Sequence, residues 1–297
     1  MDSISDEVVH DFQGFFKAYK DGRMERYPSP ANVSAGLDSK TGVQTKDILL
    51  SPETGVKART FVPKFNTPHR KLPLLVHYHG GGFSIGSPFI ASWTNFLTCM
   101  AYEANVIAIS IDYRLAPEHL LPIAYNDSLA ALQWIAKHSK GSGPEPLLNN
   151  HVDFQRVFLA GDSGRATIAN YVAIQAEVNA LPGVNIVGLL MVHPYFGDPQ
   201  EENIIYKIMS PESLGSDKDP QLNPAVDPNL SKMWCKKVLV CVAENDGVQK
   251  DHLNVVGKSY YEKVKKSEWK GSVELVENEN EGHCFHLSNP MHDMSLG

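Results

Sequence analysis

The sequence predicts an α/β fold built on a mostly parallel, doubly wound sheet. Continuous apolar runs support this fold class, at Leu72–Tyr78, Val106–Ile111, Val157–Ala160, Val184–Val192 and Lys237–Ala243. Such runs are typical of parallel strands that helices cover on both faces. Helical stretches separate the runs, and strand, helix and strand in repetition predict right-handed crossovers between parallel strands.

The segments before the first run predict two further elements. Apolar side chains at the spacing of one helix face predict an amphipathic helix that ends near Asp21-Gly22; they are Val8, Phe12, Phe15, Phe16 and Tyr19. A loose segment over Tyr27–Lys40 follows. The β-like runs Val43–Leu50 and Val56–Val62, joined by a Pro- and Gly-containing turn, predict a hairpin.

Two later segments complete the outline. One predicted helix has an apolar face of Leu129, Leu132, Ile135 and Ala136, with Asn126, Asp127 and Ser128 available as N-caps. The polar stretch Gly197–Pro228 predicts an insertion that covers the sheet, and we expect Ile204-Ile205-Tyr206 within it to pack.

The composition restricts the classes of partner. The chain has 297 residues, enough for one large α/β domain or at most two ordinary ones. Its net charge of −7 argues against nucleic acid and anionic membrane surfaces, since both need basic patches. No apolar run approaches the length of a membrane span. The sequence leaves monomer and homodimer open.

The cysteines and the N-terminal residues indicate a reducing setting. Cys99, Cys235, Cys241 and Cys284 form no CxxC pair and predict reduced, mostly buried thiols. The start, Met1–Glu7, is acidic and has no apolar core of a signal peptide. We therefore expect a cytoplasmic protein.

A serine stands where the third apolar run ends. Gly161-Asp162-Ser163-Gly164 follows Val157–Ala160 directly and leads into a predicted helix over Ala166–Val178. A serine on such a sharp turn presents its hydroxyl above the sheet edge, and the strained turn requires small neighbours. The helix N-terminus adds backbone N–H groups and a positive dipole end. This motif alone also fits a glycine-rich turn with an incidental serine.

A second glycine-rich motif follows the first run. In His79-Gly80-Gly81-Gly82-Phe83, three consecutive glycines leave backbone N–H groups unshielded. Such groups form oxyanion holes, where each donor is typically worth about 3 kcal/mol in the transition state. A flexible turn is the alternative, but the serine motif downstream favours the oxyanion hole.

An acid and a base complete a candidate triad. Asp246 follows the run that ends at Ala243, and His283 follows a β-like run over Val273–Val276. The order serine, aspartate, histidine is that of the α/β-hydrolase fold. The histidine must remove the serine proton, and the aspartate must orient the imidazole and stabilise its cation. Glu244 and Asp251 are alternatives to Asp246, and His286 is the alternative to His283.

No motif indicates a metal or a cofactor. His77 and His79, and His283 and His286, are closely spaced, but the chain has no HExxH motif and no carboxylate at ligand spacing. It also has no GxGxxG motif and no Walker-type loop.

Together these motifs resemble the plant carboxylesterases of the hormone-sensitive-lipase group. The resemblance covers nearly the whole chain and includes the opening segment; its most specific parts are His79–Phe83, Asp112–His119, Gly161–Ser163 and Glu281–His286. It implies a single eight-stranded α/β-hydrolase domain, with a cap from N-terminal helices (residues 1–40) and inserted segments (about 197–230). It also implies hydrolysis of small carboxylic esters. Ser163, His283 and Asp246 would form the triad, and the N–H groups of Gly81, Gly82 and Gly164 the oxyanion hole.

Three features depart from this family. Gly164-Arg165 stands where relatives have Ala-Gly, so we expect altered local packing, with Arg165 in contact with solvent or a carboxylate, and lower activity. The polar stretch after Phe196 is shorter than usual. The chain stops at Gly297, before the last helix of its relatives, so we expect exposed apolar surface on the sheet flank.

The predicted function is ester hydrolysis on a small plant metabolite. A lyase or cyclase of alkaloid or flavonoid biosynthesis is the alternative, as is ester hydrolysis followed by decarboxylation, since relatives of these kinds resemble the chain overall. A hormone-binding protein is a third class. The presence of His283 argues against it, because the gibberellin receptors lack this histidine.

Overall fold

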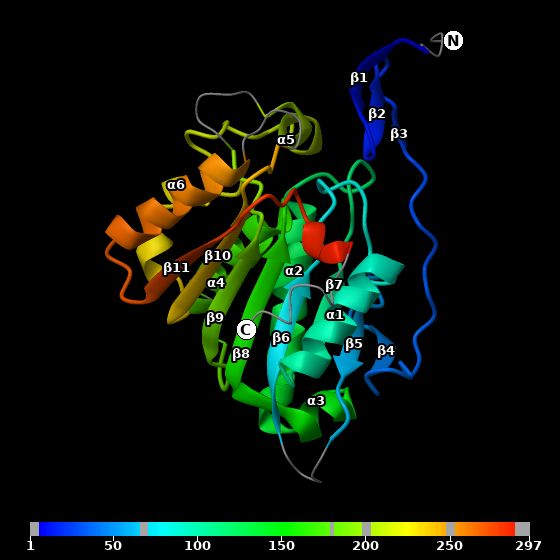
Figure 1. Cartoon of the computed structure of the whole chain (residues 1–297), viewed down its shortest axis with the longest axis vertical. Helices are drawn as coiled ribbons and strands as arrows, with labels where there is room; N and C mark the ends of the chain where they lie inside the picture. The colour runs from blue at the N-terminus through cyan, green and yellow to red at the C-terminus, as the bar shows by residue number, and fades with distance from the viewer. Residues whose placement is uncertain (1–5, 66–70, 179–180, 198–202, 248–252, 289–297) are drawn as a thin grey trace.

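An eight-stranded sheet forms the centre of the protein, seen here in a computed structural model that describes residues 6–65, 71–178, 181–197, 203–247 and 253–288. The strand order is β11-β10-β9-β8-β6-β7-β5-β4 (Figure 1). Only β5 runs against its neighbours, so the sheet is mostly parallel, as predicted. The strands are β4 (Gln44–Leu49), β5 (Lys57–Val62), β6 (Leu72–Tyr78), β7 (Ile107–Asp112), β8 (Val152–Asp162), β9 (Ile186–Val192), β10 (Lys237–Ala243) and β11 (Ser272–Asn278).

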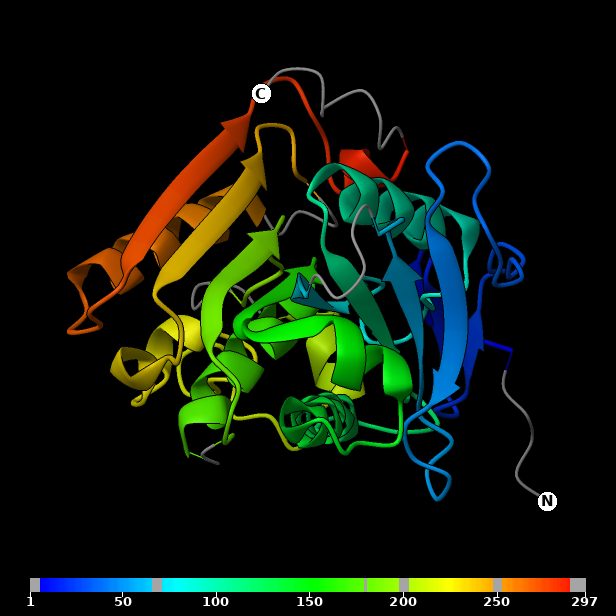
Figure 2. The ribbon, with the colours of Figure 1, turned by 90° about the horizontal axis from the view of Figure 1, so that it is seen from below.

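Helices cover both faces of this sheet, which explains the continuous apolar runs. Helix α1 (Ala91–Glu103) lies on one face, and α2 (Ile123–Ala136), α4 (Arg165–Val178) and α6 (Leu253–Lys266) lie on the other (Figure 2). The remaining helical pieces are short: α3 (Pro146–His151), α5 (Ile204–Met209), η1 (Lys137–Lys140), η2 (Pro224–Val226), η3 (Leu230–Lys232) and η5 (Phe285–Leu287). The predicted hairpin is confirmed as β4 and β5, and β6 and β10 have their predicted bounds.

The predicted N-terminal helix is wrong, because residues 8–26 form a three-stranded antiparallel sheet. Its strands are β1 (Val8–Phe12), β2 (Phe16–Tyr19) and β3 (Met24–Arg26). Phe12 and Phe16 face each other across the first turn, with ring centroids 5.0 Å apart. Two residues four apart are therefore neighbours here because they pair across two strands, and not because they share a helix face. Gly14 in the turn has a φ of +83°, which interrupts a helix.

The predicted caps of α2 are also wrong, since Asn126, Asp127 and Ser128 lie inside the helix. Asp127 is buried and accepts two hydrogen bonds from the guanidinium of Arg114, at 2.9 and 2.7 Å. It also accepts the Arg114 backbone N–H at 3.1 Å. The ion pair with Arg114 therefore determines where Asp127 lies, and the helix begins one turn earlier, after Pro122.

Two inserted segments lie at the end of the molecule to which the parallel strands point (Figure 1). One is the N-terminal sheet, whose Arg26 donates to the carbonyls of Ser84 and Ala116, each at 2.6 Å, and pairs with Glu118. The other contains α5, where Ile205 and Tyr206 are buried as expected, whereas Ile204, which was also expected to pack, is 39% exposed. Both segments therefore cover the edge of the sheet where the predicted site residues lie.

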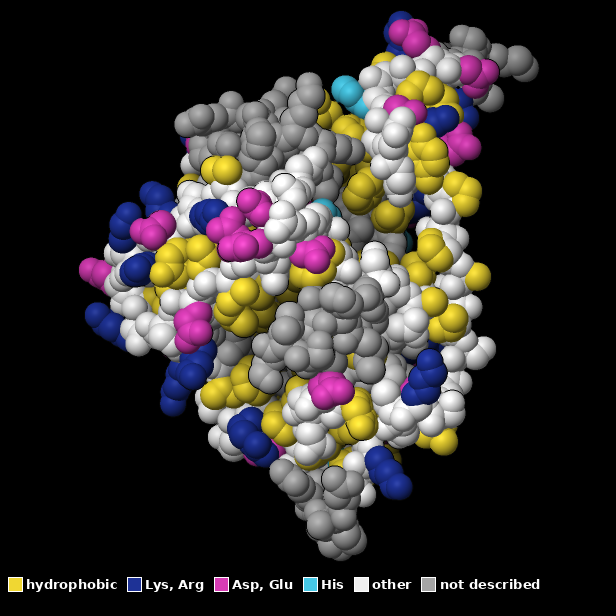
Figure 3. Space-filling view, viewed as in Figure 1, with side chains coloured by type: hydrophobic (Ala, Val, Ile, Leu, Met, Phe, Trp, Pro, Cys, Tyr) yellow, Lys and Arg dark blue, Asp and Glu magenta, His cyan; other side chains and the backbone are white. Residues whose placement is uncertain are grey.

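One part of the sheet lacks a covering helix among the described residues. On the face that carries α1, Phe158 of β8 and Val276 of β11 are 37% and 43% exposed. Figure 3 shows hydrophobic side chains on this face. The four cysteines are free, and no described helix is both long and apolar enough to cross a membrane.

A half-buried carboxylate at the end of β7, Asp112, makes stability depend on pH. Burial raises the pKa of Asp112 from 3.8 to about 6. The folded chain then binds this proton more tightly than the unfolded chain, so the stability that Asp112 contributes is present below pH 3.8 and lost as the pH rises through about 6. We expect Asp112→Asn to be more stable than wild type at pH 8 by about 1–2 kcal/mol, with the difference vanishing near pH 4. Urea unfolding at both pH values measures this, and a difference that is independent of pH would contradict it.

Candidate active site

The turn between β8 and α4 holds Ser163 in a left-handed conformation, with a φ of +54°. Two backbone hydrogen bonds to the β9 segment fix it: Ser163 N–H donates to Val192 O at 2.9 Å, and Tyr195 N–H donates to Ser163 O at 3.0 Å. Gly161 must be a glycine, because a Cβ there would lie 2.3 Å from the carbonyl oxygen of Arg165. The turn is therefore as tight as the sequence motif predicts.

A hydrogen-bonded chain joins Ser163 to the predicted base and acid. His283 Nε2 lies 2.9 Å from Ser163 Oγ, and His283 Nδ1 lies 2.9 Å from Asp246 Oδ2. Ser163 and Asp246 are buried, whereas the His283 side chain is 17% exposed. This is the geometry that proton transfer from the serine hydroxyl requires.

The alternatives proposed from the sequence occupy other positions. Glu244 accepts the backbone N–H of Asn280 at 2.7 Å and so holds the loop that leads to His283. His286 Nε2 lies 3.9 Å from Asp162 Oδ1. Asp251 lies outside the described residues.

The glycines predicted for the oxyanion hole lie beside the serine turn. Gly81 and Gly82 have φ values of +120° and +54°. A Cβ on Gly81 would lie 2.3 Å from the carbonyl oxygen of Ile85, and one on Gly82 would lie 3.0 Å from the Phe15 ring. Among the described residues, the N–H groups of Gly81, Gly82 and Gly164 donate to no protein acceptor. They are therefore available to a ligand oxygen.

A buried carboxylate precedes the serine. Asp162 Oδ2 lies 3.1 Å from His77 Nε2 and accepts the indole N–H of Trp93 at 3.1 Å. Burial alone would raise the pKa of Asp162, but His77 and then His286 outweigh it and hold this pKa well below its usual value. Asp162 is therefore an anion fixed between the sheet and α1, and its contacts hold the backbone directly before Ser163.

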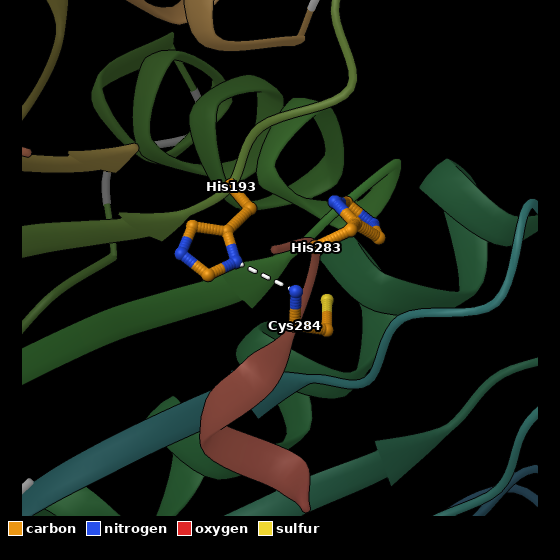
Figure 4. A group of neighbouring side chains, drawn as sticks. All are labelled: His193, His283 and Cys284. Carbon is orange, nitrogen blue, oxygen red and sulfur yellow. Dashed lines mark hydrogen bonds between the residues drawn. The ribbon is translucent and has the colours of Figure 1, made fainter. Parts of the chain in front are cut away.

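His193 supports the loop that contains His283, as Figure 4 shows. Its Nδ1 accepts the backbone N–H of Cys284 at 2.8 Å, and its ring lies 5.9 Å from that of His283. Burial, and then His286 and His283, lower the pKa of His193 to about 3. The ring is therefore neutral, with Nδ1 free to accept this bond. Cys284 itself has a left-handed φ of +54°.

Arg165 differs from its expected surroundings. It contacts neither solvent nor a carboxylate among the described residues, since it is fully buried and forms no ion pair there. Its guanidinium lies 4.7 Å from the Phe83 ring and 5.1 Å from the Tyr113 ring, and Nε donates to the Tyr113 hydroxyl. Aromatic faces replace the carboxylate because they attract a cation without adding charge. Nη1 has no partner among the described residues, and burial lowers the pKa of this group.

Sequence reasoning missed His193 and Arg26. His193 directly follows β9, at the same sheet edge as Ser163, and position at the carboxyl end of a parallel strand was a usable signal. Arg26 had no such signal, because its contacts come from segments 58 and 90 residues away. His193, His283 and Cys284 also offer possible metal ligand atoms that all lie within 4.8 Å of one another.

Comparison with known proteins gives whole-length similarities. The profile of a family described as alpha/beta hydrolase fold matches residues 75–287. The chain is 39% identical to probable carboxylesterase 5 of Arabidopsis thaliana, over 99% of this chain and 96% of that one. It is 38% identical to tuliposide A-converting enzyme 1, chloroplastic, of Tulipa gesneriana, over 99% and 77%. It is 39% identical to 2-hydroxyisoflavanone dehydratase of Glycyrrhiza echinata, over 97% and 93%.

Solved structures share the fold at lower identity. A thermostable esterase from Pseudomonas putida superposes with a TM-score of 0.68 at 22% identity, over 87% of this chain and 80% of that one. A hyperthermophilic esterase from Pyrobaculum calidifontis gives a TM-score of 0.64 at 24% identity, over 84% and 80%.

Two substitutions of Arg165 separate the effect of its volume on stability from the effect of its charge. Arg165→Ala leaves a cavity under Phe83 and Tyr113, so we expect a loss of about 2–4 kcal/mol in the free energy of unfolding. Arg165→Met fills most of that space and removes a buried, incompletely paired cation, so we expect a stability within about 1 kcal/mol of wild type. Urea unfolding measures both, and equal losses would show that the charge itself stabilises the fold.

Two substitutions of His193 test its support of the His283 loop. Asn places an acceptor close to the position of Nδ1, whereas Gln places it one bond further out. We expect kcat of His193→Gln to fall about fivefold below that of His193→Asn, since a hydrogen bond is worth about 1 kcal/mol. KM should differ little between them, because His193 touches the base and not the oxyanion glycines. Equal kcat values in steady-state assays would contradict this role.

Proposed function

Because the chain belongs to the alpha/beta hydrolase fold family, we propose that it hydrolyses small carboxylic esters through Ser163, His283 and Asp246. The observation that supports this most is the unbroken chain of contacts from Ser163 Oγ through both nitrogens of His283 to Asp246. The named carboxylesterases among its relatives support the same reaction.

In the proposed mechanism the serine forms a covalent intermediate. Ser163 Oγ attacks the ester carbonyl carbon while His283 Nε2 takes its proton, and Asp246 stabilises the resulting imidazolium. The carbonyl oxygen becomes an anion that the N–H groups of Gly81, Gly82 and Gly164 bind. His283 then gives its proton to the leaving alcohol. Water, activated by the same histidine, releases the acid and restores Ser163.

Non-hydrolytic elimination is the second candidate. It is favoured by 39% identity to 2-hydroxyisoflavanone dehydratase, which equals the identity to several carboxylesterases. The contact between Ser163 and His283 favours hydrolysis, since an elimination needs a base but no nucleophile. Mass spectrometry of the products distinguishes the two reactions, because hydrolysis adds the elements of water and dehydration removes them.

The names of the relatives indicate a broad class of substrate. Tuliposide A-converting enzymes suggest a plant metabolite as the natural substrate. We further propose a reducing compartment such as the cytosol, because all four cysteines are free. Relatives named chloroplastic and mitochondrial make imaging of a fluorescent fusion the direct test.

Removal of the nucleophile tests the proposal. We expect Ser163→Ala to lower kcat on short-chain p-nitrophenyl esters by about 10⁴-fold or more, because no other group supplies the acyl acceptor. Ser128→Ala is a matched control, since this buried serine lies in α2 and donates its hydroxyl to the Ala124 carbonyl of the same helix. A fluorophosphonate probe should label wild type and not Ser163→Ala. Equal esterase rates for Ser163→Ala and wild type would exclude the proposed role.

A further inference from the structure

Nitrogen and sulfur donors gather beside the proposed base. His193 follows β9, whereas His283 and Cys284 belong to the loop after β11. The ligand atoms that these three side chains offer all lie within 4.8 Å of one another. Figure 4 shows the Cys284 sulfur directed to the side on which His283 lies, and His193 on the other side of the same backbone segment. The mechanism uses His283 but neither the His193 ring nor the Cys284 thiol.

This donor set has the chemistry of a zinc site. Two imidazoles and a thiolate are ligands that Zn²⁺ prefers, and three protein ligands leave a fourth position for water. With Zn–N near 2.0 Å and Zn–S near 2.3 Å, tetrahedral donors lie roughly 3.3–3.6 Å apart. The side chains must therefore close in by about 1 Å for all three to bind one ion.

Charge around the cluster favours a cation. Two buried carboxylates lie near the cluster: Asp246 contacts the His283 ring, and Asp162 directly precedes Ser163. Asp246 Oδ1 also lies 2.9 Å from His283 Nδ1, and Asp162 Oδ1 lies 3.9 Å from His286 Nε2. A buried thiolate is unfavourable beside these anions, but a divalent cation at the same place is attracted by them. His193 is 1% exposed, whereas His283 and Cys284 are half-buried.

We propose that His193, His283 and Cys284 form a binding site for a thiophilic divalent cation, Zn²⁺ in particular, and that the bound ion inhibits the enzyme by capturing its base. Binding breaks the S–H bond of Cys284, forms a sulfur–metal bond and releases the proton to solvent, with no change of oxidation state. Both nitrogens of His283 already serve the triad, at 2.9 Å from Ser163 and from Asp246. Whichever nitrogen binds the metal, one of these contacts is lost. The inhibitory effect, unlike the binding, rests on the function proposed above.

The His193 hydrogen bond offers a way to separate metal binding from loop support. Its Nδ1 accepts the Cys284 N–H, a bond that a ligating Nδ1 gives up. Asn at this position keeps an acceptor for that N–H, but its amide oxygen is a poor ligand for Zn²⁺. Cys241 is the matched control for Cys284, since it is also a free, half-buried cysteine but lies in β10.

Cobalt spectroscopy tests the site without reference to catalysis. The full chain, freed of metal with a chelator, is titrated with Co²⁺ and followed by absorption. We expect a thiolate-to-cobalt charge-transfer band and the visible bands of four-coordinate Co²⁺ in wild type and in Cys241→Ser, displaced by Zn²⁺. Cys284→Ser should lose the charge-transfer band, and His193→Asn should bind at least about tenfold more weakly. Ser163→Ala should bind at least as tightly as wild type, because His283 then has no serine contact to give up.

Inhibition provides the second readout. Zn²⁺ should inhibit ester hydrolysis by wild type and Cys241→Ser alike, reversibly with EDTA. The inhibition constant should rise at least about tenfold in Cys284→Ser, measured against the activity of that variant without metal. A wild-type spectrum without a sulfur band, or one that Cys284→Ser retains, would overturn the site. Binding without inhibition would overturn only the capture of the base, and absence of esterase activity in metal-free wild type would count against the proposed function alone.

Discussion

The strained backbone at Ser163 is the constraint on which the rest of the structure depends. A residue with a φ of +54° at the end of a buried strand keeps that conformation only if its surroundings leave no alternative. Hydrogen bonds to the β9 segment hold the serine on one side, and Asp162 is fixed by His77 and Trp93 on the other. The serine turn is thus held from two sides, where a nucleophile needs a defined direction.

Parallel strands explain why residues far apart in sequence meet at this turn. The carboxyl ends of β6, β8, β9 and β10 lie along one edge, and the glycine loop, Ser163, His193 and Asp246 follow those ends. Only His283 must reach the site from the sheet margin, after β11. Two side chains therefore hold its loop in place. Glu244 accepts a hydrogen bond from the Asn280 backbone N–H, and His193 accepts one from the Cys284 backbone N–H. These supports position the base without touching the reacting atoms.

The sequence predicted those parts of the fold that depend on local pattern and failed where distant contacts decide. Buried strands, the hairpin and the serine turn follow from apolar runs and small residues, which local physics largely determines. The Phe12 and Phe16 spacing fits both a helix face and a tight hairpin, and only Gly14 between them distinguishes the two. Asp127 is a helix cap by residue type, yet the distant Arg114 binds it. No pattern of residues reveals such a partner, nor the aromatic rings that accept Arg165.

The cation beneath the glycine loop also has a consequence for how this sequence can change. An alanine at position 164 would place its Cβ 3.1 Å from the Phe83 ring, the same ring that stacks on Arg165. Positions 164 and 165 are therefore not independent, because an alanine at position 164 would require the Phe83 ring to shift while Arg165 packs against that same ring.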